Sequence, residues 1–303
     1  MNLKIVFLGT SAAVPTLERS LPAIAYVWKG EILLFDAGEG VQRQMLKAGL
    51  SILKINKVFI THNHGDHVIG LLGLIHTMSM YGRTKDLEIY GPKSVWNFLK
   101  ESIETIGHDP QYRIVFRSIN EGTIVDEEDY VVKPFKVDHG GVEAYGYVFE
   151  EKRRLGRLDV KKLVELKVPQ GPLWKMLQKG MDVVLENGRI IKWSDVVKPE
   201  HYKIKVVYTG DTRPVKNTVE ASKNATVLIH DGTFDDSMSR EAHEQGHSTA
   251  SDAAKIAAEA NVDLLILTHI SARYKNPETL LNEAKRIFEK TTIAYDFLTI
   301  ILF

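Results

Sequence analysis

Three histidines and an aspartate lie within seven consecutive residues of the chain, Thr-His-Asn-His-Gly-Asp-His at positions 61–67. The stretch follows the strand-like residues 57–60, Lys-Val-Phe-Ile, and a helical pattern begins near Val68. A turn between a strand and a helix lets closely spaced side chains converge, and Gly65 relieves the crowding. Imidazole with carboxylate suits Zn²⁺, with Mn²⁺ or Fe as substitutes. We favour a metal-binding loop over a surface cluster of histidines without a ligand.

Three later strand-like runs end in the same kinds of side chain. His139 follows residues 130–137, Asp211 follows the run that begins at 205, and His269 follows residues 263–268. Strand ends at one edge of a layered fold can meet in space, so we expect these residues to converge on the first loop. One carboxylate can bridge two ions. The predicted ligands are His62, His64 and His139 for one ion, Asp66, His67 and His269 for the other, and Asp211 between them.

Such a ligand set predicts hydrolase chemistry. Two metal ions about 3.5 to 4 Å apart can share a water, lower its pKa and stabilise charge on an attacked phosphoryl or carbonyl group. The chain has no cysteine, which excludes disulfides and thiolate ligands. A di-iron redox site remains open on the ligands alone.

The elements that must position these residues are short apolar runs and helical patterns. With 303 residues, 44% of them apolar, the chain can bury a large core in one domain or two. Early strands adjoin one another like hairpins, whereas later strands alternate with helices. This order predicts an α/β fold, a layered sandwich of two mixed sheets with helices outside.

One region, about residues 151–182, does not fit a compact core. It carries Gly and Pro, and residues 150–179 hold nine Lys or Arg against four Asp or Glu. We predict a protruding arm inserted in a single domain of residues 1–303. On charge alone, a solvated helix face is the competing interpretation.

We expect a cytoplasmic protein without membrane contact. No stretch approaches the roughly 20 consecutive apolar residues of a membrane span, and residues 1–10 run into a strand-like pattern without a signal-peptide cleavage site. The 39 basic and 39 acidic residues balance, so no global charge indicates a polyanionic partner.

The first loop together with His139, Asp211 and His269 resembles the metallo-β-lactamase superfamily, which implies a four-layer αβ/βα sandwich. That resemblance does not settle the substrate. Further segments resemble the family of ribonuclease Z, the tRNA 3′ processing endonuclease. They are residues 7–20, 33–44, 168–180, 230–234, 243–257, 267–274 and 294–298.

The family resemblance implies a zinc-dependent endoribonuclease that removes the 3′ trailer from precursor tRNA by phosphodiester hydrolysis and leaves a 3′-hydroxyl. It implies two Zn²⁺ per subunit on the seven predicted ligands, with Asp66 in proton transfer around the nucleophilic water. It also implies that Glu244 with His247 protonates the leaving oxygen. From the residues alone, His247 could equally be a helix-start residue beside Ser248 and Thr249.

The resemblance further implies that the arm, with its Gly171-Pro172 motif, grips the elbow of the tRNA. Basic residues there, including Arg153, Arg154 and Arg157, can neutralise phosphates far from the cut. A homodimer is implied, with the arm of one subunit serving the other's active site.

Two smaller expectations concern residues beside the predicted metal ligands. Arg273 and Tyr274, four and five residues after His269, can bind a phosphate or stack on a terminal base, although a structural salt bridge for Arg273 stays open. The polar turn at 36–40 is expected to buttress the metal loop.

Two rival functions remain. One is another hydrolase on this scaffold, thioesterase or arylsulfatase-like, which keeps the metals but not the arm. The other is an RNA-binding protein that has lost catalysis.

Overall fold

The computed structural model describes residues 2–107, 109–119, 122–152, 157–198 and 204–303. The described chain divides into two compact units. The first comprises Met1–Asp126, Val131–Glu150 and Ile204–Phe303, and the second comprises Glu127–Tyr130 and Glu151–Lys203.

The first unit contains two mixed sheets of seven strands each. In order across the first sheet, the strands are β20 (Thr299–Leu302), β1 (Leu3–Gly9), β3 (Ala23–Trp28), β4 (Glu31–Phe35), β5 (Ile55–Phe59), β6 (Leu87–Gly91) and β7 (Ile114–Ser118). Those of the second are β19 (Thr291–Ile293), β17 (Leu265–Thr268), β16 (Val227–Asp231), β15 (Lys205–Tyr208), β10 (Tyr145–Glu151), β9 (Tyr130–Lys136) and β8 (Val125–Asp126). Neighbours are antiparallel from β20 to β4 and parallel from β4 to β7.

Aromatic rings join the two sheets face to face. Phe35 on β4 stacks on Phe59 of β5, with ring centroids 4.8 Å apart, and meets Tyr147 of β10 and Tyr208 of β15 edge-on. The Tyr147 hydroxyl also donates to the carbonyl of Ile60 at 2.6 Å. Offset and edge-on contacts of this kind add to the stabilisation from burial.

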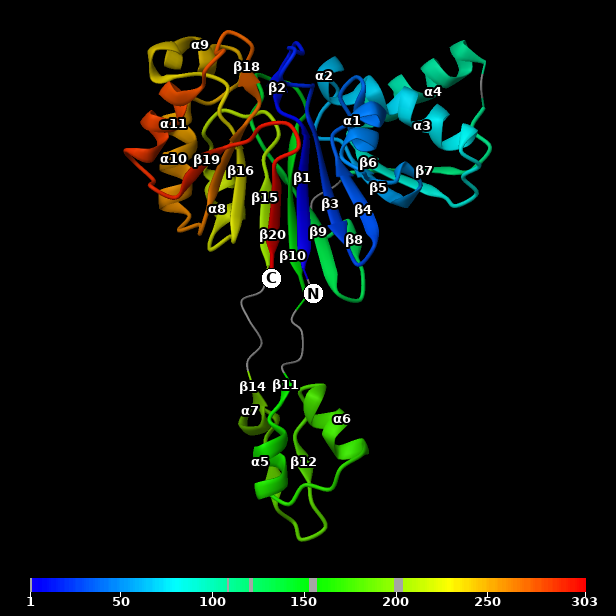
Figure 1. Ribbon diagram of the computed structural model, residues 1–303, viewed down its shortest axis with the longest axis vertical. Coiled ribbons are helices and arrows are strands. Elements are labelled where there is room, and N and C mark those ends of the chain that lie inside the picture. The colour runs from blue at the N-terminus through cyan, green and yellow to red at the C-terminus, as the bar shows by residue number, and fades with distance from the viewer. Residues whose placement is uncertain (1, 108, 120–121, 153–156, 199–203) are drawn as a thin grey trace. The chain divides into compact units, whose positions relative to one another are not determined.

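Helices cover the outer face of each sheet (Figure 1). Helices α1 (Val41–Lys47), α3 (Gly70–Met80) and α4 (Lys93–Ile106) pack on the first sheet, and α8 (Lys216–Ser222), α10 (Ala250–Glu259) and α11 (Glu278–Lys285) pack on the second. The parallel strands β16 and β17 are therefore buried at every residue. The predicted four-layer αβ/βα sandwich is confirmed.

Short elements gather at one edge of the sandwich (Figure 1). They include α2 (Gly65–Val68), α9 (Ser239–Glu244), the 3₁₀ turn η2 (Asp236–Met238), and the parallel pair β2 (Ser11–Ala12) and β18 (Ile270–Ser271). A further 3₁₀ turn, η1 (Ile52–Lys54), leads into β5. The loops that follow β5, β9, β15 and β17 carry the predicted ligands.

The second unit has a small core of its own. Its elements are β11 (Arg157–Leu158), α5 (Val160–Glu165), α6 (Pro172–Gln178), β12 (Val183–Val184), β13 (Ile190–Ile191), α7 (Trp193–Val196) and β14 (Val197–Lys198). Strand β11 pairs with β14, and Leu163, Leu177 and Val196 are fully buried. The segment 151–182, predicted as the arm, lies within this unit, which extends beyond residue 182 because β14 pairs with β11.

None of the helices in the described ranges is long and apolar enough to cross a membrane.

Candidate metal centre

The loop after β5 is held in place by hydrogen bonds to a buried carboxylate. Asp36, directly after β4, accepts hydrogen bonds from the Thr61 N–H at 2.8 Å and the Tyr208 hydroxyl at 2.7 Å, and its Oδ2 lies 2.8 Å from His67 Nδ1. Asp36 has a φ of 57°, a left-handed conformation that Asp tolerates better than most residues. The prediction that the 36–40 turn supports the loop fits these contacts.

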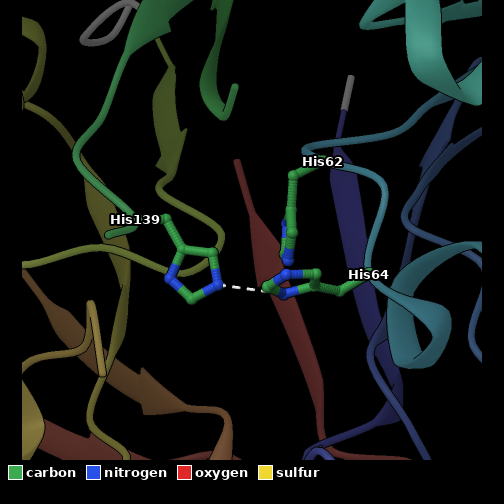
Figure 2. A group of neighbouring side chains, drawn as sticks. All are labelled: His62, His64 and His139. Atoms are coloured by element: carbon green, nitrogen blue, oxygen red, sulfur yellow. Dashed lines mark hydrogen bonds between the residues drawn. The ribbon is translucent and has the colours of Figure 1, made fainter. Parts of the chain in front are cut away.

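Of three groups of residues that could hold a metal ion in the described structure, two include residues of this loop. In each group, one ligand atom per residue lies within 4.8 Å of those of the other members. Figure 2 shows the first group, in which His62 and His64 face His139 from the β9–β10 turn, and His139 Nε2 lies 3.0 Å from His64 Nδ1. The second group is Asp66, His67, Asp211 and His269.

Asp211 belongs to the second group and also approaches the first. Its Oδ2 is 3.2 Å from His67 Nε2 and 3.3 Å from His269 Nε2, and 3.7 Å from His62 Nε2 and 3.9 Å from His139 Nε2. The structure thus brings together all seven residues that the sequence singled out, with Asp211 in the predicted central position.

The candidate ligands His139 and His269 each have a polar partner at Nδ1, the ring nitrogen that does not face Asp211. His139 Nδ1 lies 2.8 Å from the carbonyl of Gly246, and His269 Nδ1 lies 2.8 Å from Thr233 Oγ1. Partners of this kind fix the ring orientation and the tautomer of a metal-binding histidine.

The residues fit a cation at this centre. In the part of the chain that the structure describes, His62 Nε2, His67 Nε2 and Asp211 Oδ1 are buried without a hydrogen-bond partner, an arrangement that is costly unless another group satisfies them. Burial would raise the pKa of Asp211, but the imidazoles of His269 and His67 hold it well below its ordinary value. An ionised carboxylate among imidazole nitrogens is a ligand set for Zn²⁺, Mn²⁺ or Fe.

His247 lies beside the centre, with its ring centroid 4.9 Å from that of His139 and 5.1 Å from that of His269. Its Nδ1 is 2.8 Å from Oδ2 of Asp231, the fully buried last residue of β16. Burial would lower the pKa of His247, but Asp231 raises it to about 9.

In the structure, the carboxylate in contact with His247 is not that of Glu244. Glu244 ends α9, is 62% exposed, and accepts from Arg240 Nε at 2.8 Å. The carboxylate in contact with His247 is therefore that of Asp231, a residue that was not among the predicted ones. Its signal was available, since Asp231 ends an apolar run as the predicted ligands do.

Arg273 and Tyr274, predicted to contact the substrate, both make contacts with other residues of the protein. The Arg273 guanidinium lies 4.8 Å from the Phe234 ring centroid and 3.5 Å from Glu241 Oε1, and remains 42% exposed. The Tyr274 hydroxyl accepts from the Asp235 N–H at 2.9 Å, which fixes this ring. Arg273 thus has the salt bridge that the sequence left open.

The predicted arm residues belong to the second unit. Gly171 and Pro172 begin α6, with the proline at its first position, where a missing N–H costs nothing. Arg157 lies in β11. Arg153 and Arg154 lie outside the described residues.

Two mixed sheets between helices, with His and Asp clusters at one edge, define a metallohydrolase of the metallo-β-lactamase fold. Residues 3–161 match the family model described as anti-Pycsar protein Apyc1, and residues 196–270 match that of the beta-lactamase superfamily domain. Over its whole length the chain belongs to the ribonuclease Z family, the endoribonucleases of tRNA 3′ processing.

The relatives cover nearly the full chain. Ribonuclease Z of Archaeoglobus fulgidus is 44% identical over 303 residues, covering 99% of this chain and 98% of that protein. Ribonuclease Z of Gemmatimonas aurantiaca is 42% identical, with 98% and 95% covered. Among solved structures, the short form of human tRNase Z superimposes with a TM-score of 0.70 at 28% identity, covering 98% of each chain.

Proposed function

We propose that this chain removes the 3′ trailer from precursor tRNA by hydrolysing one phosphodiester bond and leaving a 3′-hydroxyl. The observation that carries the proposal is the position of His247, held by a buried carboxylate, against a cluster of seven candidate ligands. A thioesterase has less need of such an acid, because a thiolate leaves more readily than the O3′ alkoxide of RNA.

The seven residues would hold two Zn²⁺ ions in the predicted groups. His62, His64 and His139 would bind one ion, Asp66, His67 and His269 the other, and Asp211 would bridge them. Ions bound there would supply stabilisation for charge on the phosphoryl group and lower the pKa of the attacking water.

Asp66 is suited to orient the attacking water as an ionised carboxylate. Burial would raise its pKa, but His67 and His269 lower it, so the carboxylate is ionised at neutral pH. Its Oδ2 accepts from the Ala13 N–H at 3.1 Å and lies 3.4 Å from His269 Nε2, contacts that fix its direction. We assign to Asp66 the orientation of the attacking water.

His247 is suited to donate a proton. With its pKa raised to about 9, the imidazole is protonated at neutral pH. Because Nδ1 is engaged by Asp231, Nε2 remains for the departing O3′. We assign the protonation of the leaving oxygen to His247 and its orientation to Asp231.

We also propose that the second unit binds the tRNA away from the cut. Its own buried core lets it present charge on a stable surface. The exposed lysines of this unit include Lys161, Lys162, Lys167, Lys175 and Lys179. Lysines contact phosphates without reading sequence, so this surface would position the tRNA rather than select a base.

The test of the reaction uses precursor tRNA labelled at its 5′ end and zinc-loaded protein, with His64→Ala as the inactive comparison. We expect a single cut near the discriminator base, a 3′-hydroxyl on the product, and loss of the cut in the variant. Intact RNA together with hydrolysis of small esters by the wild-type protein would contradict the substrate assignment.

We propose a homodimer in which each arm serves the partner's active site. Mixing a protein that lacks residues 152–203 with the His64→Ala protein tests this directly. If arms act in trans, the mixture regains cleavage that neither protein has alone. Gel filtration showing an active monomer would contradict the dimer.

A further inference from the structure

Arg213 connects three segments of the centre although it contacts no candidate ligand side chain by a hydrogen bond in the described structure. Its backbone N–H donates to the carbonyl of Asp138 at 2.8 Å, and its Nη1 lies 3.1 and 3.2 Å from the two Asp138 carboxylate oxygens. Its Nε donates to the carbonyl of His243. One guanidinium therefore ties the β9–β10 turn to the end of α9.

Each of these segments carries a residue of the proposed reaction. Asp138 directly precedes His139, and His243 lies four residues before His247. The two segments also touch, because His139 Nδ1 lies 2.8 Å from the Gly246 carbonyl. Arg213 itself follows Asp211 by two residues, so it extends from the middle of the ligand cluster.

The Arg213–Asp138 ion pair is partly exposed, so we expect it to affect the geometry of the site more than the stability of the whole protein. Arg213 is 30% exposed and Asp138 is 45% exposed. Half-exposed ion pairs contribute little to the free energy of unfolding, about 0–1 kcal/mol. Their geometric effect is not reduced in the same way, because planar guanidinium bonds fix the direction of the groups they join.

We propose that Arg213 is a positioning residue that holds the His139 turn against the His247 loop, and so sets the distance between the metal centre and the acid that protonates the leaving oxygen. The inference rests on the proposed acid role of His247. Without the guanidinium, the His243 carbonyl and the Asp138 carboxylate lose their shared donor. The Arg213 backbone N–H still donates to the Asp138 carbonyl, but between the His139 turn and the His247 loop only the His139–Gly246 contact named above remains, and the Ser248 hydroxyl still donates to the Thr212 carbonyl at 2.6 Å.

The test compares two substrates that differ in their need for an acid. Hydrolysis of a short RNA releases the O3′ alkoxide, which must be protonated, whereas bis(4-nitrophenyl) phosphate releases 4-nitrophenolate without protonation. For Arg213→Ala we expect kcat on RNA to fall about 10–100-fold, because a displacement of about 1 Å at a reacting group has this effect. We expect KM for RNA, zinc content and turnover of bis(4-nitrophenyl) phosphate to stay near wild type.

Two further variants calibrate the result. Arg213→Lys keeps the charge but has a single nitrogen, so it should restore only part of kcat. Arg117→Ala removes a remote guanidinium on β7 that pairs with Glu88 at 2.9 Å and is 54% exposed. It should leave both substrates unaffected, which shows that loss of a surface ion pair alone has no effect.

The possible outcomes distinguish this inference from the proposed function. If His247→Ala slows both substrates equally, the acid role of His247 fails, whatever Arg213 does. If His247→Ala slows RNA selectively but Arg213→Ala has no effect, the positioning role is overturned. Loss of zinc with equal losses on both substrates would also overturn it, because Arg213 would then support only His139.

Discussion

Replacing Asp36 by Asn tests whether the proposed metal site depends on a carboxylate that touches no substrate. The change keeps the size of the side chain, and Asn also tolerates the left-handed φ of 57°. What it removes is the second carboxylate oxygen. In the wild-type protein Oδ2 faces both His67 Nδ1, at 2.8 Å, and the Tyr208 hydroxyl, at 2.7 Å.

The consequence for His67 follows from its tautomer. The carboxylate accepts a hydrogen bond from a protonated Nδ1, which leaves the Nε2 lone pair for a metal ion. An amide N–H at the same place favours the tautomer protonated at Nε2, which cannot bind. We expect zinc affinity to fall about 10–100-fold, roughly 1.4–2.7 kcal/mol. The metal-free protein should also lose about 2–3 kcal/mol of unfolding free energy, since buried charge-assisted hydrogen bonds are broken.

Competition with a zinc chelator measures the first effect, and urea unfolding of the metal-free protein measures the second. Tyr208→Phe is the matched control, because it removes one donor to Asp36 and leaves the Asp36–His67 contact. We expect about 1 kcal/mol of destabilisation there and little change in zinc affinity. Equal zinc affinities for Asp36→Asn and wild type would refute the reasoning.

Three further predictions concern other parts of the chain. Burial would raise the pKa of Asp252, but the hydrogen bond with His243 and those with Thr249 lower it. Its stabilisation is therefore present at neutral pH and is lost as the pH falls. In urea unfolding, Asp252→Asn should cost about 1 kcal/mol at pH 7, and the difference should shrink below about pH 4. Leu163→Ala, in the core of the second unit, should destabilise that unit by about 2–5 kcal/mol, so limited proteolysis should cut within residues 151–203 while the sandwich keeps its melting temperature. Gly246 has a φ of 82°, and a Cβ there would lie 2.8 Å from the backbone carbonyl carbon of His139. Gly246→Ala should cost about 1–2 kcal/mol of backbone strain and lower zinc affinity in chelator competition.

The convergence of the ligands could be predicted from the sequence because it follows from topology. Parallel strands end at the same edge of a sheet. The apolar runs before Asp211 and His269 form β15 and β17, which lie in one sheet with only β16 between them. The short spacing from His62 to His67 needs no topology at all. These two rules account for each half of the cluster, whereas the meeting of the halves depends on how the two sheets pack, since β5 belongs to the other sheet.

The partner of His247 could not be predicted from local spacing. Glu244 is three residues away in the chain, but it ends a helix and faces solvent. Gly246, with its left-handed φ, reverses the chain so that His247 turns inward to Asp231. The contact joins two segments 16 residues apart, and only the strand-end rule applied to β16 would have indicated it.

The C-terminal boundary of the second unit could not be predicted from the sequence either. Its charge pattern ends near residue 182, yet its core needs Val183, Ile191 and Val196. These residues lie in elements of two to four residues. Periodicity cannot be recognised over so short a length, because fewer than two helical turns or strand repeats are present.

The turn after β15 shows why substitutions in this centre should not act independently. Within residues 210–213, each side chain or backbone group contacts a different part of the site. Gly210 lies against Thr61, where a Cβ would approach the threonine side chain to 2.7 Å. Asp211 lies among the imidazoles, the Thr212 N–H donates to Asp231 at 3.1 Å, and Arg213 holds Asp138. We therefore expect a change at any of these positions to displace a candidate ligand and the carboxylate beside His247 together. The loss of activity in a double variant should therefore be smaller than the sum of the losses in the two single variants, as expected for residues that act as one unit.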